Sequence, residues 1–382
     1  QVPRLRFPGF NDAWEQRKFK ELVFLRSETV ESQDYSVDIE LENLESNTGR
    51  IIGNTSVRTM SNTLFKKGDI LFGKLRPYLN KWRFADEEGV KSGEIWAFSC
   101  REGYSNRFIY CVIQSNGFLD EVNITSGTKM PRADWKTVSN IKITIPTIEE
   151  QTTIGNFFRQ LDAAIASHQR KLERTNKLKK SLLQKMFPKD GEAFPELRFP
   201  DFTDAWEQRK LGEVGQIYTG NTPPTSDKDN WSTQDNEYIW ITPTDINSLT
   251  TNKSERYLSK KGWDKARVVP KHSILITSIA SIGKNTINSI PAAFNQQINA
   301  IVPKNNDAYF ILSAMIKNVE KFASLAGRTA TPIINKTTFQ QFALIIPLEP
   351  EQTAIGNFFR QLDEAIASHQ RKLERTNKLK KS

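Results

Sequence analysis

The sequence predicts an α+β fold: two α/β modules separated by two long antiparallel helices that form an intramolecular coiled coil, in a pseudo-twofold circular arrangement. The first observation behind this prediction is a long repeat, since residues 351–382 copy residues 150–181 with only two changes. The second is a shorter repeat, since residues 197–210 copy residues 5–18, again with two changes. The chain therefore contains a duplicated, nearly constant frame.

The third observation is that the segments between the repeats, 19–149 and 211–350, share almost no identity. The period of about 200 residues is too long for a solenoid repeat, so whole domains are duplicated. A constant frame with two unlike inserts indicates a scaffold that presents two different recognition surfaces.

Composition favours a polyanionic partner. The 382 residues include 54 Lys and Arg against 44 Asp and Glu, a net charge of +10. Many soluble proteins are also mildly basic, so charge alone does not establish nucleic-acid binding. No apolar run reaches the roughly 18–20 residues that cross a bilayer, and no signal-peptide core begins the chain, so we expect a soluble, cytoplasmic protein. Cys100 and Cys111 match no zinc pattern, and we expect free thiols in a reducing cytosol.

The repeated block is predicted to be helical. From Glu150 to about Met186 there is no Pro and a single Gly, and apolar residues recur at spacings of three and four. His168 interrupts this apolar seam. A long helix with one apolar stripe needs a partner, and the second copy supplies an identical stripe. Because a domain-sized insert separates the copies, we expect an antiparallel pair.

The ends of the chain favour a circular arrangement. The first helix is expected to end at Phe187-Pro188, and the following link leads into the second frame segment. The second helix stops at Lys381-Ser382, where the first copy would continue into that link, and the chain begins where the link ends. We therefore expect the termini to be close in space.

Within the modules, short strands and helices are predicted. Residues 69–72, 273–277, 141–145 and 342–346 have the pattern of strands, and residues 107–115 and 308–317 have helical periodicity. The predicted domains are residues 1–149 (with the frame segment 1–18), helix 150–187, linker 188–195, residues 196–349 and helix 350–382.

Catalytic motifs are not found. Residues 221–225 resemble the Asn-Pro-Pro-aromatic motif of amino-methyltransferases, but a Thr splits the motif and no aromatic follows. Residues 278–285 resemble the end of a P-loop but lack its first Gly and the Ser/Thr after Lys. His168 and His369 are equivalent helix positions and His272 is alone, so we expect neither a metal site nor catalysis in this chain.

Two pairs of loops are candidates for nucleic-acid recognition. Residues 73–83 interleave basic and aromatic side chains after a strand, and residues 276–285 occupy the equivalent place in the second module. Residues 125–132 and 326–332 each precede the last strand of a module and are basic and hydroxyl-rich. Lys and Arg contact phosphates, while planar or amide groups reach base edges. Solvated basic hairpins and polar connecting turns would show the same patterns. The candidate DNA-binding residues are Lys74, Arg76, Tyr78, Lys81, Arg83, Ser126, Thr128, Lys129, Arg132, Thr277, Ser278, Ser281, Lys284, Asn285, Arg328, Thr329 and Thr331.

The sequence resembles the specificity subunit of Type I restriction-modification enzymes. The resemblance rests on the Ile-Pro-x3-Glu-Gln junctions at 145–151 and 346–352, each followed by x2-Ile and a long helix. The strand at 68–71, the Asn-Gln-Gln-Ile segment at 295–298 and the repeated Phe-Pro-x-Phe block add to it. It covers essentially the whole chain, and the duplicated architecture is more specific than any one motif.

The resemblance implies a non-catalytic protein with two target recognition domains, each reading one half of a bipartite site in double-stranded DNA. Its helices would set the spacing and dock two methyltransferase subunits. The candidate partner-binding residues are Phe157, Phe158, Arg159, Phe358, Phe359 and Arg360. S-adenosylmethionine, ATP and Mg, with methylation, translocation and cleavage, would belong to the methyltransferase and restriction subunits, and this chain would hold no cofactor.

Two alternatives stay open at this point. One is a scaffold that binds nucleic acid without sequence specificity, or binds protein, and the other is a stand-alone enzyme. The basic helix tail 170–180 is either a binding surface or a solvated face.

Overall fold

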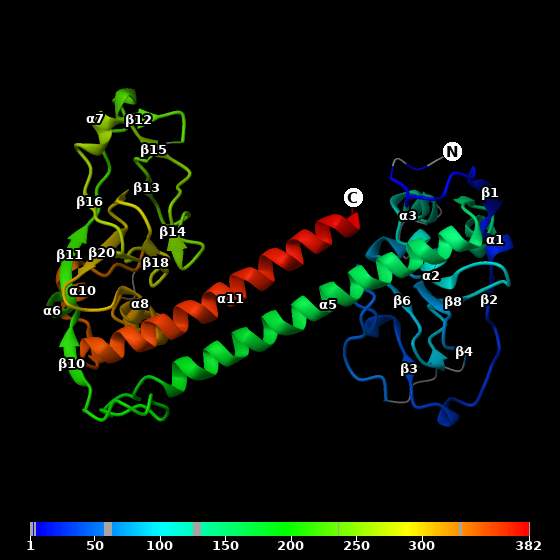
Figure 1. The fold of residues 1–382 in the computed structure, drawn as a ribbon, viewed down its shortest axis with the longest axis horizontal. Helices are drawn as coiled ribbons and strands as arrows, with labels where there is room; N and C mark the ends of the chain where they lie inside the picture. Colours follow the sequence, from blue (N-terminus) through cyan, green and yellow to red (C-terminus); the bar gives the residue numbers. More distant parts are fainter. Residues whose placement is uncertain are drawn as a thin grey trace. The chain divides into compact units, whose positions relative to one another are not determined.

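The computed structural model describes residue 3 and residues 5–56, 63–124, 131–235, 237–327 and 331–381. The chain divides into two compact units, and each is described by itself. Unit 1 comprises residues 1–166 and 376–382, and unit 2 comprises residues 167–375. The division falls within both long helices, so each unit contains one module and part of each helix (Figure 1). The first frame segment and the last turns of the second long helix both belong to unit 1, as the circular arrangement predicts.

Unit 1 is built around a four-stranded antiparallel sheet of order β2-β8-β5-β6, beside a three-stranded sheet of order β3-β7-β4. A separate pair, β1-β9, joins the frame to the end of the module. The elements are β1 (Glu15–Lys18), α1 (Phe19–Leu22), β2 (Val23–Leu25), η1 (Ser32–Asp34), β3 (Asp38–Ile39), η2 (Leu41–Asn43), β4 (Thr63–Phe65), β5 (Ile70–Gly73), η3 (Pro77–Leu79), β6 (Trp82–Phe84), β7 (Gly89–Lys91), β8 (Ile95–Cys100), α2 (Asn106–Val112), α3 (Asn116–Ile124), α4 (Trp135–Val138), β9 (Lys142–Ile145) and the first part of α5 (Ile148–Lys185).

Unit 2 contains a five-stranded sheet of order β11-β20-β17-β18-β14, a three-stranded sheet of order β13-β19-β16, and the pairs β12-β15 and β10-β21. The elements are β10 (Glu207–Lys210), α6 (Leu211–Val214), β11 (Gly215–Thr219), η4 (Lys228–Asn230), β12 (Trp231–Ser232), β13 (Trp240–Ile241), β14 (Thr250–Thr251), β15 (Tyr257–Leu258), α7 (Lys260–Trp263), β16 (Val268–Val269), β17 (Ile274–Thr277), β18 (Asn285–Asn288), β19 (Ala292–Phe294), β20 (Ile298–Pro303), α8 (Ala308–Lys317), α9 (Val319–Ala323), α10 (Lys336–Gln341), β21 (Ala343–Ile346) and α11 (Glu349–Lys381).

The central strands are apolar without interruption because both of their faces are covered. Along β5, Ile70 and Phe72 enter one core cluster while Leu71 enters another. Along β17, Ile274 and Ile276 alternate with Leu275 in the same way. Side chains alternate between the faces of a strand, so a continuous apolar run supplies two cores at once. The predicted strands and helices of the modules are confirmed, with bounds that shift by up to three residues.

The two long helices pair in antiparallel fashion, as predicted. Within unit 2, the His168 and His369 rings lie 5.8 Å apart, and Lys179 Nζ lies 2.6 Å from Asp363 Oδ1. From the first contact to the second, the residue number rises along α5 and falls along α11, so the two helices run antiparallel. Within unit 1, Lys380 Nζ lies 2.6 Å from Asp162 Oδ1, which are the equivalent residues of the repeat.

The duplicated frame makes the same contacts in each unit. The Arg6 guanidinium binds the Glu150 carboxylate through two hydrogen bonds of 2.7 and 2.6 Å. The Arg198 guanidinium binds the Glu351 carboxylate in the same way, at 2.8 and 2.7 Å. The glutamate side chains are 1% and 3% exposed. Because a buried carboxylate needs its cation, each pair fixes how the frame meets the start of its long helix.

Gly155 lies where α5 passes the start of α2. A Cβ at this position would come within 2.8 Å of Arg107 Cβ and 2.9 Å of Phe108 N. The repeated glycine therefore permits a close helix–helix approach, although it weakens the helix locally.

No helix among the described residues is both long enough and apolar enough to span a bilayer. Cys100 and Cys111 are free thiols, as predicted. Burial raises the pKa of each thiol to about 12.

Candidate nucleic-acid interface

In unit 1, the two loops singled out from the sequence lie against each other. Leu75 and Arg132 form an isolated antiparallel bridge. Arg76 N donates to Pro131 O at 2.7 Å, and Ala133 N donates to Lys74 O at 2.8 Å. The loop after β5 and the segment before α4 therefore form one surface.

A third segment, the turn before β8, completes this surface. Lys74 N donates to Glu94 O at 2.9 Å, and Glu94 N donates to Ser92 Oγ at 3.2 Å. The Glu94 carboxylate accepts from Arg132 Nη2 at 2.7 Å, which orients the guanidinium. Residues 74–80, 92–94 and 131–133 are called loop cluster 1. The pattern of basic residues does not predict Glu94, because its role depends on a contact with Arg132, which lies 38 residues away along the chain.

Unit 2 builds the same cluster with different side chains. Ile279 and Ile333 form the equivalent bridge, and Ala280 N donates to Pro332 O at 3.0 Å. Ile334 N donates to Ser278 O, and Ser278 N donates to Gln297 O, both at 2.8 Å. Residues 278–284, 295–297 and 332–334 are called loop cluster 2. The predicted structural equivalence of the loops is confirmed.

Each cluster has a left-handed residue at its tip. Arg76 has φ of 49° and Ala280 has φ of 59°. Residues other than Gly rarely adopt this conformation, and they do so where surrounding contacts impose it. The hydrogen bonds from these two residues to Pro131 and Pro332 are such contacts.

The exposed side chains of loop cluster 1 are those of Arg76, Tyr78 and Arg132. The Tyr78 side chain is 54% exposed and that of Arg132 is 55% exposed. Lys74 is half-buried. A guanidinium, a phenol and an oriented Arg–Glu pair are groups that contact phosphates or base edges.

Lys81 and Arg83 are engaged within the fold. Lys81 Nζ donates to Leu41 O at 2.8 Å. The Arg83 side chain is 18% exposed and lies 3.7 Å from the Asp86 carboxylate on the same hairpin. These two residues shape the hairpin, and we do not include them in the proposed contact surface.

Three predicted residues of the second module are buried, which corrects the expectation that they face a ligand. Thr277 is 0% exposed, Ser278 is 1% exposed and Asn285 is 9% exposed. The Thr277 hydroxyl donates to Ser281 O, and Ser278 Oγ accepts from Asn299 Nδ2 at 3.0 Å. Their hydroxyl and amide groups hold the loop in place.

Ser281, Lys284 and Thr331 are exposed on or beside loop cluster 2. The remaining candidates, Ser126, Thr128, Lys129, Arg328 and Thr329, lie outside the described residues.

Two further features were not predicted from the sequence. Lys91, on β7, is 5% exposed, and burial together with the charge of Lys74 lowers its pKa to about 8. In unit 2, the exposed Arg256 guanidinium stacks 3.8 Å from the Trp231 ring centroid. Neither residue is near a motif in the sequence, because strand pairing creates both environments.

The predicted partner-binding residues fall into two groups. Phe157, Arg159 and Arg360 are exposed, with Phe157 at 38%. Phe157 packs on Phe7 with ring centroids 5.5 Å apart.

The other three are covered to different extents. Phe358 packs in the same way on Phe199, at 6.0 Å, and is half-buried, as is Phe158. Phe359 is 0% exposed within the core of unit 2, so a direct contact with a partner subunit is excluded in this structure.

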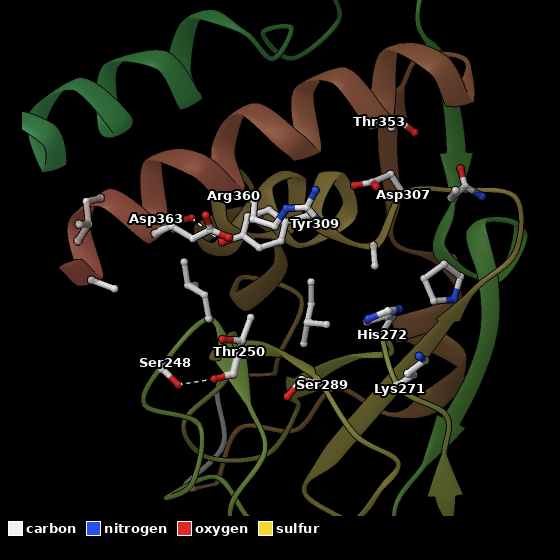
Figure 2. A pocket seen from close by; sticks show the side chains of 18 of the residues that line it. Ser248, Thr250, Lys271, His272, Ser289, Asp307, Tyr309, Thr353, Arg360 and Asp363 are labelled. Carbon is white, nitrogen blue, oxygen red and sulfur yellow. Dashed lines mark hydrogen bonds between the residues drawn. The ribbon is translucent and has the colours of Figure 1, made fainter.

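Unit 2 also contains a cavity of about 960 Å³ between α11 and the module (Figure 2). Arg360 and Tyr309 line the side formed by the helices, and Lys271 and His272 line the sheet side. Tyr309 Oη donates to Asp363 Oδ2 at 2.8 Å, which ties α8 to α11. His272, isolated in the sequence, lies beside Lys271 on the wall of this pocket. Across the part of the chain that the structure describes, no cluster of three or more His, Cys, Asp or Glu side chains could hold a metal ion.

Comparison with known proteins identifies the family. The family model described as "Type I restriction modification DNA specificity domain" matches twice, at residues 11–177 and 203–378. The HindI specificity subunit of Haemophilus influenzae is 24% identical over 74% of this chain and 77% of its own length. The MjaIX specificity subunit of Methanocaldococcus jannaschii is 26% identical over 46% of this chain, which spans 41% of that relative.

Solved structures show the same fold. The specificity subunit of a Type I system from M. genitalium aligns with a TM-score of 0.72 at 15% identity, covering 100% of this chain and 97% of the other. A second match is a chain from a solved structure on the complex assembly and conformational transition of the type I R-M system. It aligns with a TM-score of 0.53 at 17% identity, covering 97% of this chain and 96% of that chain. With both halves matched by the family model, this chain belongs to the Type I restriction-modification specificity subunits and carries two DNA specificity domains.

Proposed function

We propose that the chain is the non-catalytic DNA-recognition subunit of a Type I restriction-modification complex, in which each specificity domain reads one half of a bipartite site. Loop cluster 1 reads one half and loop cluster 2 reads the other. One observation carries this proposal. The same three segments are held by equivalent backbone hydrogen bonds in both units, while the side chains they present differ.

The chemistry of the clusters suits two different readouts. Loop cluster 1 presents Arg76, Tyr78 and an Arg132 guanidinium oriented by Glu94, whereas loop cluster 2 presents Ser281 and Lys284. Arginine in a fixed orientation suits guanine, and hydroxyl groups accept or donate to several bases. One good base contact contributes about 1–3 kcal/mol of discrimination. Lysines on phosphates add affinity without sequence information.

The long helices serve as spacer and docking surface in this proposal. Their repeated sequence offers two equivalent surfaces to two methyltransferase subunits, with Arg159 and Arg360 exposed at equivalent positions. Adenine methylation, translocation and cleavage, together with S-adenosylmethionine, ATP and Mg, belong to the methyltransferase and restriction subunits.

Exchange of one module tests the proposal. Residues 19–149 are replaced by the corresponding segment of a relative, and residues 5–18 and 150–181 are kept. With partner subunits present, sequencing of methylated DNA should show a change in one half-site and an unchanged spacer. A change in both half-sites, or in neither, would overturn the assignment.

A scaffold that binds nucleic acid without sequence specificity, or binds protein, is the alternative. The exposed, aromatic-stacked Arg256 suits general backbone binding as well as sequence readout. Competition of a labelled target duplex by a scrambled duplex distinguishes the two. Equal competition by both duplexes favours the alternative.

A further inference from the structure

A fourth segment lies against loop cluster 2 in unit 2. Residues 220–224 follow β11, and Asn221 N donates to Phe294 O, at the end of β19, at 3.0 Å. A Cβ at Gly220 would lie 2.2 Å from Asn295 O and 2.3 Å from Phe294 O, so only glycine permits this approach. The segment therefore packs directly on the turn that follows β19.

Hydrogen bonds fix the path of this segment. Trp240 Nε1 donates to Asn221 O at 3.1 Å, and Asn221 Nδ2 donates to Lys265 O at 2.9 Å. The backbone N–H of Arg267 donates to Asn221 Oδ1 at 2.5 Å. Thr222 comes next and is followed by a proline, which restricts its backbone to extended conformations. The position of the Thr222 side chain is therefore set by the fold of unit 2.

Thr222 orients one of three neighbouring amides. The Thr222 hydroxyl donates to Gln296 Oε1 at 2.6 Å. On either side of Gln296, Asn295 Nδ2 donates to Gln297 Oε1 and Gln297 N donates to Asn295 Oδ1, both at 3.1 Å. Gln296 is exposed, and within the part of unit 2 that the structure describes its Nε2 has no hydrogen-bond partner. An oriented amide is thus presented to solvent on loop cluster 2.

The equivalent position in unit 1 carries no such amide. Glu94 O and Gln297 O accept equivalent backbone hydrogen bonds from the loops after β5 and β17, which makes Gly93 the equivalent of Gln296. Unit 1 instead orients the Arg132 guanidinium through the Glu94 carboxylate. The two units therefore use the same turn to hold different hydrogen-bonding groups.

The oriented amide fits adenine. With Oε1 bound to the Thr222 hydroxyl, Gln296 offers the Nε2–H donors and a further lone pair on Oε1. In the major groove adenine presents its N7 acceptor beside its N6 amino donor, and a Gln side chain bonds both at once. Guanine presents two acceptors there, and cytosine and thymine lack N7. Adenine is therefore the base whose edge matches this amide.

We infer that Gln296 is a specificity-determining residue of the second specificity domain and reads one adenine of its half-site, with Thr222 as a positioning residue. The inference rests on the proposed function and adds a base that this domain requires. It also assigns a role to the Asn-Thr-Pro-Pro sequence of residues 221–224, which positions a base-reading side chain.

Removal of the adenine N7 atom tests the contact. Sequencing of methylated DNA from the complex with its partner subunits gives the two half-sites, and the module exchange assigns one of them to unit 2. Each adenine of that half-site, on either strand, is then replaced in turn by 7-deazaadenine, which lacks the N7 acceptor. At one position the complex should bind at least about 5-fold more weakly. Gln296→Ala should bind the unmodified duplex about 5- to 150-fold more weakly and show no further loss on the modified duplex.

Two further sets of variants control this test. Gln208→Ala, at an exposed position of β10 in the frame, should keep the parent affinity and the parent sensitivity to 7-deazaadenine. Thr222→Val should reduce the sensitivity at the same position without lowering the Tm, and Thr222→Ser should restore it. Unchanged sensitivity in Thr222→Val would overturn the positioning role of Thr222.

The outcomes separate the inference from the proposed function. If the parent complex binds its methylated sequence no better than a scrambled duplex, both fail. If the parent complex discriminates but Gln296→Ala keeps the 7-deazaadenine effect, the inference alone is overturned. The same holds if no adenine of the half-site is sensitive to the replacement.

Discussion

Substitution of Gly155 by Ala has two opposing effects on stability: it raises helix propensity, and it crowds the contact between α5 and α2. The structure indicates that crowding is the larger effect. In an exposed helix the change stabilises by up to about 1 kcal/mol. At Gly155 the new Cβ would lie 2.8 Å from Arg107 Cβ and 2.9 Å from Phe108 N, so atoms of the α2 backbone region must move. Overpacking of this kind costs about 1–3 kcal/mol. With a cost in the upper part of that range, about 2–3 kcal/mol, and a propensity gain of up to about 1 kcal/mol, we expect the free energy of unfolding to fall by about 1–2 kcal/mol.

Two matched variants sharpen this prediction. Gly117→Ala adds a Cβ with nothing within 4 Å, and should be neutral or slightly stabilising. At Gly356, the repeat counterpart of Gly155, the new Cβ meets the Asp307 carboxylate, which caps α8 by accepting from Phe310 N at 2.7 Å. A side chain can rotate away at the cost of its cap, about 1 kcal/mol, which offsets the propensity gain. The new Cβ also lies 3.1 Å from Phe310 N, so Gly356→Ala should cost less than Gly155→Ala without being stabilising.

Thermal unfolding of the full chain measures the series. A loss of about 1–2 kcal/mol corresponds to a decrease in Tm of roughly 2–8 °C for a unit of this size. Gly155→Ala should lower the Tm of unit 1, while Gly117→Ala should not. If Gly155→Ala unfolds at or above the parent temperature, the close approach of α5 to α2 is not a constraint, and the reasoning fails.

Three further predictions follow from single side chains. Arg76→Ala should weaken binding to the cognate duplex by about 5- to 150-fold and relax specificity in one half-site, whereas the exposed frame variant Arg17→Ala should not. Lys91 has its pKa lowered to about 8, so the unfolded chain binds more protons between about pH 8 and 10.5. Stability relative to Lys91→Met should therefore rise with pH across that window, and a flat difference in unfolding free energy would contradict the burial argument. Phe187→Ala should cost about 3–5 kcal/mol in denaturant unfolding of unit 2, where the ring is buried in the core, and a loss below 1 kcal/mol would contradict that packing.

The helices and the equivalence of the loops could be predicted because their signals are local. Apolar spacing over more than thirty positions specified α5 and α11, which extend over 38 and 33 residues. The loops were matched by their position after β5 and β17, and strand order preserved that match in space. The antiparallel pairing of α5 and α11 could be predicted because the apolar stripe of the first helix is repeated in the second.

The exposure of individual loop residues could not be predicted, because it depends on where the strands end. Thr277 and Ser281 are both hydroxyl residues in one polar run, yet β17 extends through Thr277 and turns its side chain inward. The Ser278 side chain is buried, and its hydroxyl accepts a hydrogen bond from Asn299, which lies 21 residues away on β20. No local pattern distinguishes these positions.

The contacts between frame and module explain how two unlike modules fit one frame. In unit 1, Gln151 Oε1 accepts from the backbone N–H of Ser105, and in unit 2 the equivalent Gln352 accepts from the backbone N–H of Asp307, each at 3.1 Å. The frame side chain is the same in both units, and at this contact each module supplies the main-chain N–H of the residue that caps a helix. Any residue except Pro can provide that donor. This contact therefore constrains the path of each module without constraining the side chain of the donor residue, and the modules can differ in sequence at that position.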